Sequence, residues 1–303
     1  GIIRMTKPEV TIVAPAIRTD WWMELYEAID KSNDTGLQFI FVGHKEPDYK
    51  LPNNFQYIYS NLDASRCVEI AFRNVKTEYV MNIADDYDPS PEHMSSNIVD
   101  KCLEEHKRVE ALGVEHFFVG PSFKLGPEEK FSKAIPLLYH NHDHASPVLT
   151  ISPLTKLSTN RFLGGVANGF EGMYWDTDLN MRLYEAGGQS KVMGMELTDG
   201  VWEENPNSDE YIYFTERDNT LCTSKMSELG TNPLSQRISG RDERYFRRLW
   251  SPVSHQGRTL EDGRHLFDID KVNLRNELYD PIYLYSTENP QLSPYLKASK
   301  KVK

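Results

Sequence analysis

The first 120 residues alternate between strand-like and helix-like runs, and this alternation limits the fold more than any other feature of the sequence. Runs rich in β-branched and aromatic residues predict strands at 9–16, 37–43, 55–60, 78–84 and 115–120. Apolar residues at helical spacing predict helices at 19–32, at 65–75 and from Pro91 to about Leu112. Strands joined through helices imply an α/β fold with a mostly parallel sheet flanked by helices. In such sheets, ligands bind beyond the carboxyl ends of the strands.

The ends of several helices can also be predicted. Thr19 or Asp20 is expected to cap the helix at 19–32, and Pro91 suits the first position of the long helix that follows it. A further helix is expected to begin near Tyr174 and to stop at the pair Gly187-Gly188. The stretch between, 121–160, is rich in Pro, Ser and His and shows less regular periodicity.

Composition excludes some classes of protein. The net charge of −11 argues against a broad basic face for nucleic acid. The 3 cysteines are odd in number and lack a CxxC pair, so we expect no disulfide framework, no zinc motif and a reducing, cytoplasmic setting. No apolar run is long enough to predict a transmembrane helix, and no signal peptide is apparent.

The stretch "NIADDYDPSP" places Asp85, Asp86 and Asp88 directly after a predicted strand. Carboxylates at a strand end offer hard oxygen ligands to Mg²⁺ or Mn²⁺, which usually takes one or two of them and completes its shell with water and phosphate. The alternative is a simple acidic turn, because the nearby prolines form turns and Asp caps helices.

A second acidic feature lies in "GGVANGFEGMYWDTDLNMRLYEAGG", 164–188, where Asp176 and Asp178 fall in the first turn of a predicted helix. One interpretation is a carboxylate general base at the mouth of the sheet, kept ionised by the helix terminus. The other is structural, since acidic residues favour helix N-termini through capping and the helix dipole.

Together these stretches resemble a family. "VTIVAPAIR", "LQFIFVG", "EYVMNIADDYDPSPEHM" and "LGGVANGFEGMYWDTDLNMRLYEAGG" are similar, in order and spacing, to the family 2 type of nucleotide-sugar glycosyltransferase with the GT-A fold. The resemblance covers roughly residues 8–200. It implies a catalytic domain over 1–200, with a Rossmann-like nucleotide-binding half and an acceptor half. Residues 201–303 would form a helical or irregular extension that packs on the core or makes an oligomer contact.

The resemblance also implies roles for individual residues. Asp86 corresponds to the metal ligand, Asp88 to a second acidic contact, and Asp176 to the catalytic base, with Asp178 as the other candidate for the base. The residues implied to bind the nucleotide come from the strand ends and the helix that follows, namely Pro15, Ala16, Arg18, Gly43, Arg66 and Asp85.

The implied activity is that of a hexosyltransferase. A nucleotide-diphosphate sugar, with a UDP-sugar favoured, would transfer its sugar to a hydroxyl of a glycan or another acceptor. Crowded carboxylates would repel the diphosphate unless a cation bridged them, so Mn²⁺ or Mg²⁺ is expected independently of the resemblance. A base that is separate from the metal site favours a single in-line displacement with inversion at the anomeric carbon.

The sequence departs from the family at two places, one of which concerns recognition of uridine and the other catalysis. Val42, Gly43 and His44 stand where the family usually carries an acidic residue that reads uracil. Trp175 replaces the first acid of the family's "ED" pair, which makes a catalytically inactive nucleotide- or carbohydrate-binding protein the alternative. A nucleotidyltransferase would share the sheet and the acidic site, but "APAIRTDWW" lacks its Gly-rich, basic loop.

Two further stretches have no settled role. "HNHDH" at 140–144 is read either as a polar loop, as part of an acceptor pocket or as a metal site. "GRDERYFRRLW" at 240–250 predicts an amphipathic helix that buries Tyr245, Phe246, Leu249 and Trp250. In that helix Arg247 or Arg248 is either a diphosphate contact or a surface charge, and the C-terminal part as a whole could mediate a homo-oligomer.

Overall fold

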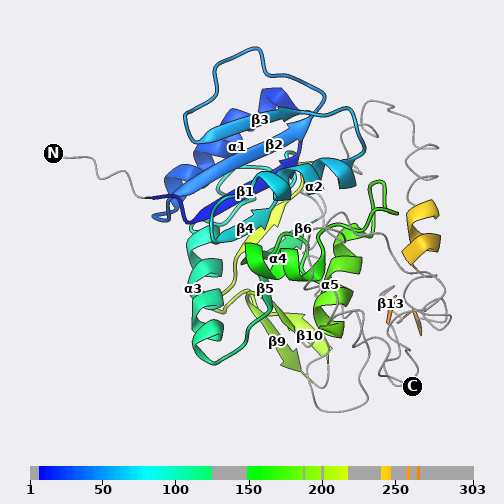
Figure 1. Ribbon diagram of the computed structural model, residues 1–303. Coiled ribbons are helices and arrows are strands. Elements are labelled where there is room, and N and C mark those ends of the chain that lie inside the picture. The colour runs from blue at the N-terminus through cyan, green and yellow to red at the C-terminus, as the bar shows by residue number, and fades with distance from the viewer. Residues whose placement is uncertain are drawn as a thin grey trace.

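The structure, a computed structural model, describes residues 7–124, 149–186, 188–198, 201–217 and 240–246, and two short strands at 258–259 and 265–266. Figure 1 shows one large sheet with helices on both of its faces. "HNHDH" at 140–144 lies outside the described residues, and so do Arg247, Arg248, Leu249 and Trp250.

A seven-stranded sheet forms the centre of the molecule, in the order β3-β2-β1-β4-β7-β5-β8. The first four of these strands in chain order are β1 (Val10–Pro15), β2 (Leu37–Gly43), β3 (Phe55–Tyr59) and β4 (Tyr79–Asn82). The other three are β5 (Phe117–Gly120), β7 (Leu154–Lys156) and β8 (Gln189–Val192). The five strands predicted from the sequence are all present, each with ends within about two residues of the prediction.

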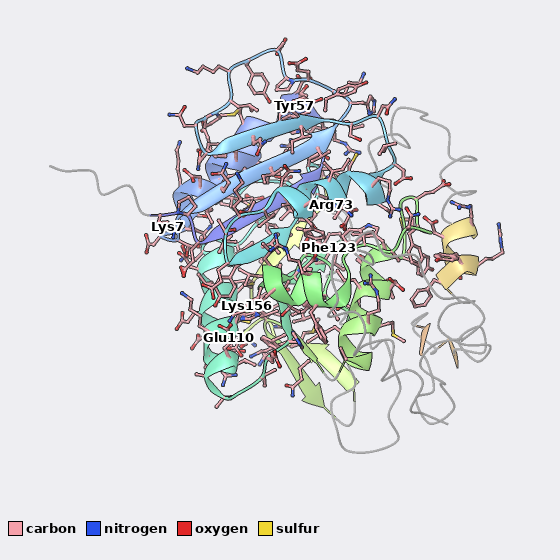
Figure 2. The ribbon with its side chains drawn as sticks, viewed as in Figure 1. Lys7, Tyr57, Arg73, Glu110, Phe123 and Lys156 are labelled. Atoms are coloured by element: carbon pink, nitrogen blue, oxygen red, sulfur yellow. The ribbon has the colours of Figure 1, made fainter. Side chains whose placement is uncertain are left out.

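Most neighbouring strands run parallel, but β7 runs antiparallel to both β4 and β5. The sequence did not predict β7, which lies in the stretch that showed little periodicity. Its last residue, Lys156, lies at the amino-terminal edge of the sheet and pairs with Glu110 (Figure 2). The predicted fold class, a mostly parallel α/β sheet flanked by helices, is confirmed and is consistent with the GT-A type.

Separate groups of buried apolar residues cover the two faces of the sheet. On one face, α1 (Thr19–Ser32) and α3 (Ile98–Ala111) share a core with alternate residues of β1 and β2, in which Trp22 and Phe39 are fully buried, and α3 lies against β5 and β7. The other face is covered by α2 (Ala64–Asn74), α4 (Leu157–Leu163) and α5 (Trp175–Glu185). Because β1 is buried on both faces, its run of apolar residues is nearly continuous.

The predicted start of the long helix after β4 was wrong. Helix α3 begins at Ile98, and Pro91 lies in a turn where the backbone N–H groups of His93 and Met94 both donate to Ser90 O. Asn97 then adopts a left-handed conformation with φ of 59°, which separates this turn from the helix. Proline therefore marked a turn here rather than a first helical position.

Three two-stranded ribbons complete the described structure: β9 (Met195–Thr198) with β10 (Val201–Glu204), β6 (Ser122–Lys124) with β11 (Tyr213–Thr215), and β12 (Arg258–Thr259) with β13 (His265–Leu266). Strands β10 and β11 follow residue 200 but pair with strands that precede it. None of the helices in the described part of the chain has the length and hydrophobicity needed to cross a membrane.

Candidate active site

The turn between β1 and α1 is held by the carboxylate of Asp85, which lies in the segment that follows β4. Asp85 Oδ2 accepts hydrogen bonds from the backbone N–H groups of Ile17 (2.8 Å) and Arg18 (2.7 Å) and from the indole of Trp22 (3.1 Å). Its Oδ1 accepts from the Arg18 guanidinium at 2.7 Å. Helix α1 has no side-chain cap of its own, so Asp85 takes the place that Thr19 or Asp20 was expected to fill.

These four contacts define what Asp85 and Arg18 do in the structure. The Asp85 side chain is almost completely buried, and each of its oxygens already accepts from the β1–α1 region. Asp85 therefore fixes the β1–α1 turn to the end of β4. Its predicted contact with the nucleoside, and that of Arg18, stay predictions, and a nucleotide would meet both groups already paired.

The ends of β1 and β2 meet so closely that only glycine fits at position 43. A Cβ atom on Gly43 would lie 1.8 Å from Ala16 O, and the Ala16 N–H donates to Val42 O at 2.8 Å. Gly43 O accepts from Tyr57 Oη and from the Ser60 N–H. Pro15, Ala16 and Gly43 thus lie together at the carboxyl edge of the sheet, and the close approach of Ala16 gives a structural reason for the glycine; their predicted contact with the nucleotide stays a prediction.

The spacing of Asp86 and Asp88 follows from an extended backbone. Residues 86–88 run antiparallel to 215–217, because Arg217 N donates to Asp86 O, Asp88 N donates to Thr215 O, and Tyr87 bridges Glu216. The Tyr87 side chain points into the core, where it is 2% exposed and stacks on Phe214 at 4.6 Å. Alternate residues of an extended chain point to opposite sides, so Asp86 and Asp88 share the side away from Tyr87.

The carboxylates of Asp86 and Asp88 could bind a divalent cation whose other ligands come from water or from a bound phosphate. The Asp86 side chain is fully buried, whereas Asp88 is half-buried. Burial alone would raise the pKa of the Asp88 carboxyl, but hydrogen bonds from Ser90 and the nearby charges of His93 and Arg217 lower it overall. Among the described residues, no three His, Cys, Asp or Glu side chains gather into a metal site, so the remaining ligands would be water and phosphate oxygens.

Arg217 is a candidate for binding a diphosphate, and the sequence analysis did not single it out. Its guanidinium lies 4.5 Å from the centre of the Trp21 ring, and the Arg18 guanidinium lies 5.8 Å from the same ring. Arg217 also donates to Glu24 at 3.1 Å and is close enough to Asp88 to lower its pKa. Two guanidinium groups therefore flank the acidic cluster, which is an arrangement that suits a diphosphate. No sequence motif around Arg217 pointed to this place.

The loop between α4 and α5, residues 164–174, is held by two side chains of α2. Arg66 donates to Ala167 O at 2.7 Å and to the amide oxygen of Asn168. Glu69 is completely buried, and its Oε2 accepts from the Val166 N–H at 2.8 Å. Arg66 was predicted to bind the nucleotide, and that role stays a prediction. In the structure its guanidinium orders the loop that leads into α5.

The two acidic residues of α5 differ in their surroundings. Asp178 is fully buried and forms an ion pair with the equally buried Arg182, whose Nε and Nη2 lie 3.0 and 2.9 Å from Asp178 Oδ2. Asp176 is partly exposed, and its Oδ1 accepts from the Thr177 N–H at 2.8 Å. The ion pair favours a structural role for Asp178 and leaves Asp176 as the stronger candidate for the base.

Burial raises the pKa of Asp176 despite the hydrogen bonds from Thr177. The helix terminus was expected to keep this carboxylate ionised, and desolvation outweighs that effect. A raised pKa makes the ionised carboxylate a better proton acceptor. Asp176 remains a base only at pH values above its shifted pKa.

The structure brings the two acidic stretches to one place. Asp86 and Asp176 are 90 positions apart in the sequence, yet the charges of both raise the pKa of the Tyr87 hydroxyl, after the larger effects of burial and of the Glu216 charge. The Tyr87 hydroxyl is hydrogen-bonded to Ser152 at 2.5 Å. The charges of the candidate metal ligand and of the candidate base therefore act on the same region, although the two residues belong to different elements.

No protein-family model matches the chain, and no curated protein matches it in sequence. Solved structures match it in shape. S. aureus TarS 1-349 has a TM-score of 0.43 at 11% identity and covers 69% of this chain and 60% of its own. A longer S. aureus TarS structure gives the same score and identity over 69% of this chain and 36% of its own.

The TarS 1-349 structure was also solved in complex with UDP, with the same score and identity over 68% of this chain and 60% of its own. The bifunctional IspDF from Campylobacter jejuni has a TM-score of 0.37 at 10% identity, covering 65% of this chain and 51% of its own. The chain thus spans less than two thirds of the length of each of these structures. Because the superpositions are this loose, the assignments that follow rest on the geometry of the chain itself.

Proposed function

We propose that the chain is a metal-dependent, inverting glycosyltransferase that moves a sugar from a nucleotide-diphosphate sugar to a hydroxyl of a glycan or another acceptor. The observation that carries this proposal is the Asp86–Asp88 pair on one side of the extended segment after β4, together with Asp176 in the first turn of α5, whose charge, like that of Asp86, reaches the Tyr87 hydroxyl. One carboxylate belongs to an Asp-x-Asp pair at a strand end, and the other lies in the first turn of a helix on the same site. Transfer from a nucleotide sugar needs both kinds of group.

The donor would lie over the carboxyl ends of β1, β2 and β4, close to Pro15, Ala16 and Gly43. Asp86 and Asp88 would hold Mn²⁺ or Mg²⁺, and such an ion would offset the charge that develops on the leaving group. A UDP-sugar is the favoured donor from the resemblance.

The transfer itself is a single displacement. The acceptor oxygen forms a bond to the anomeric carbon while the bond from that carbon to the phosphate oxygen breaks, and the nucleoside diphosphate leaves with the electron pair. Asp176 takes the proton of the acceptor hydroxyl. Because the nucleophile enters opposite the leaving group, the anomeric configuration is inverted.

Binding tests the first half of the proposal. Thermal shift with a panel of nucleotide sugars, with and without Mn²⁺ or Mg²⁺, should show metal-dependent stabilisation by at least one nucleotide. Asp86→Asn should weaken this binding at least about tenfold, equivalent to about 1.4 kcal/mol. Asp48→Asn, at an exposed position, is the matched control and should bind normally. If no nucleotide binds in the presence of metal, the proposal fails.

Turnover tests the second half. Asp176→Asn should bind the nucleotide as the unaltered protein does but transfer or hydrolyse the donor about 10²- to 10⁴-fold more slowly. A full rate in this variant would remove Asp176 from the role of base. A protein that binds nucleotide but never turns over would instead match the inactive binding protein suggested by Trp175.

A further inference from the structure

A short helix from the C-terminal region, residues 240–246, packs on the loop that leads into α5 (Figure 1, gold beside green). Its Asp242 is completely buried. Asp242 Oδ1 accepts from the Glu171 N–H at 3.1 Å, and Oδ2 accepts from the N–H groups of Gly172 (2.9 Å) and Met173 (2.8 Å). One carboxylate thus satisfies three consecutive backbone donors about 70 positions away in the sequence.

Aromatic side chains of the same short helix pack against the start of the loop segment 169–174. The Tyr245 ring lies where a side chain at position 169 would be, since a Cβ on Gly169 would come within 2.1 Å of it. Tyr245 also meets Phe170 edge to face at 4.8 Å. Both ends of the loop segment 169–174 are therefore covered by residues 242–246.

The contact surrounds a strained residue. Tyr174 has a φ of 62°, in the left-handed region that side-chain-bearing residues rarely adopt. The preceding N–H, of Met173, is held by Asp242, and the Tyr174 ring lies 5.4 Å from that of Phe246. Tyr174 O in turn accepts from the Asp178 N–H at 2.8 Å, which closes the first turn of α5. The direction of that turn, which carries Asp176, depends on the conformation of Tyr174.

We propose that Asp242 is a positioning residue for Asp176. By holding the amides of Glu171, Gly172 and Met173, it keeps Tyr174 in its left-handed conformation and so sets where α5 begins. A carboxylate suits this task better than an amide, because both of its oxygens accept and three donors converge on it. The inference rests on the proposed role of Asp176 as the base, but the ordering of the turn can be measured without any turnover.

Hydrogen exchange measures the ordering directly. In Asp242→Ala, amides of the peptide covering 171–178 should exchange at least tenfold faster than in the unaltered protein, while the peptide covering 19–32 should not change. Arg244→Gln, an exposed position on the same short helix, is the matched control and should leave both peptides unchanged. Unchanged exchange at 171–178 in Asp242→Ala would overturn the proposal. Should Asp242→Ala fail to fold, Asp242→Asn, which keeps the shape and one accepting oxygen, is measured in its place against the same criterion.

A double-mutant cycle separates positioning from general support of the fold. Asp242→Asn should lower kcat for donor turnover at least tenfold without changing the KM for the donor. In the Asp176→Asn background, the same substitution should cost little more, because the base it positions is already lost. An equal loss in both backgrounds would overturn the proposal. If the unaltered protein turns over no donor, the proposed function fails, and the exchange experiment still decides whether Asp242 orders the turn.

Discussion

Glu69 gives the sharpest test of the electrostatics around the 164–174 loop. Its side chain extends from α2 and is completely buried, with Oε2 accepting from the Val166 N–H. Oε1 lies 3.5 Å from Nε of Arg73, which Figure 2 shows on the same helix. Burial raises the pKa of Glu69 from 4.5 to about 7, more than the hydrogen bond from Val166 and the charge of Arg73 lower it.

This shift makes stability depend on pH in a direction opposite to that of most carboxylates. Between pH 4.5 and 7, Glu69 binds a proton in the folded protein but not in the unfolded chain. The stability that this group contributes is therefore fully present below pH 4.5 and is lost as the pH rises to about 7. At about 1.36 kcal/mol per pKa unit, the loss amounts to about 3 kcal/mol.

Replacing Glu69 by Gln should abolish this loss. Glutamine keeps an oxygen that accepts from Val166 and does not ionise, so the variant should match the unaltered protein near pH 4.5. At pH 8 it should be more stable by about 3 kcal/mol, equivalent to roughly 6–12 °C in Tm. Urea denaturation from pH 4.5 to 8 measures the difference, with Glu104→Gln, exposed on α3, as the control. A difference that stays constant over this pH range would refute the reasoning.

Three further outcomes are expected. Gly43→Ala should destabilise the protein by about 1–3 kcal/mol in urea denaturation, because its Cβ would collide with Ala16 O; unchanged stability would show that the strand ends separate freely. Arg182→Met should cost about 3–5 kcal/mol, since it leaves the Asp178 charge buried without its ion-pair partner, and Asp178→Leu combined with it should recover most of that. The rate of donor turnover should fall as the pH is lowered, with an apparent pKa above 3.8, because burial raises the pKa of Asp176. A pH–rate profile that falls only with an apparent pKa at or below 3.8 would contradict this.

Local periodicity was sufficient to predict most of the sheet. The strand at 37–43 and the helix at 19–32 appear with the predicted ends. Each has apolar residues at the spacing of its own secondary structure over its whole length, and each is followed by residues that favour a turn. Strand β7 escaped prediction because three residues contain too little pattern. Its place between β4 and β5 is set by tertiary contacts, which local periodicity does not record. The wrong start of α3 has a similar cause, since proline at 91 favours a turn and a first helical position equally well.

The sequence was sufficient to choose the acidic residues of the candidate site but not to predict its internal contacts. An Asp-x-Asp pair after a strand and an acidic first turn of a helix are local patterns, and both lie at the site. The Asp85 carboxylate and the Arg66 guanidinium have partners between 63 and 102 positions away, so no local pattern could reveal them. The pair Asp178–Arg182 is different, because its i,i+4 spacing is visible in the sequence and would have predicted the ion pair.

Among the acidic residues of the candidate site, Asp85 and Asp178 hold structure, whereas Asp86, Asp88 and Asp176 are the candidates for chemistry. Asp85 fixes the β1–α1 turn, and the next residue is the candidate metal ligand Asp86. Asp178 fixes α5 through Arg182, which also donates to Leu163 O, and lies two residues after the candidate base Asp176. Each chemical carboxylate is therefore placed by a buried neighbour in the same segment. A sequence motif records both residues of each pair alike, whereas the structure shows which contacts Asp85 and Asp178 make within the fold.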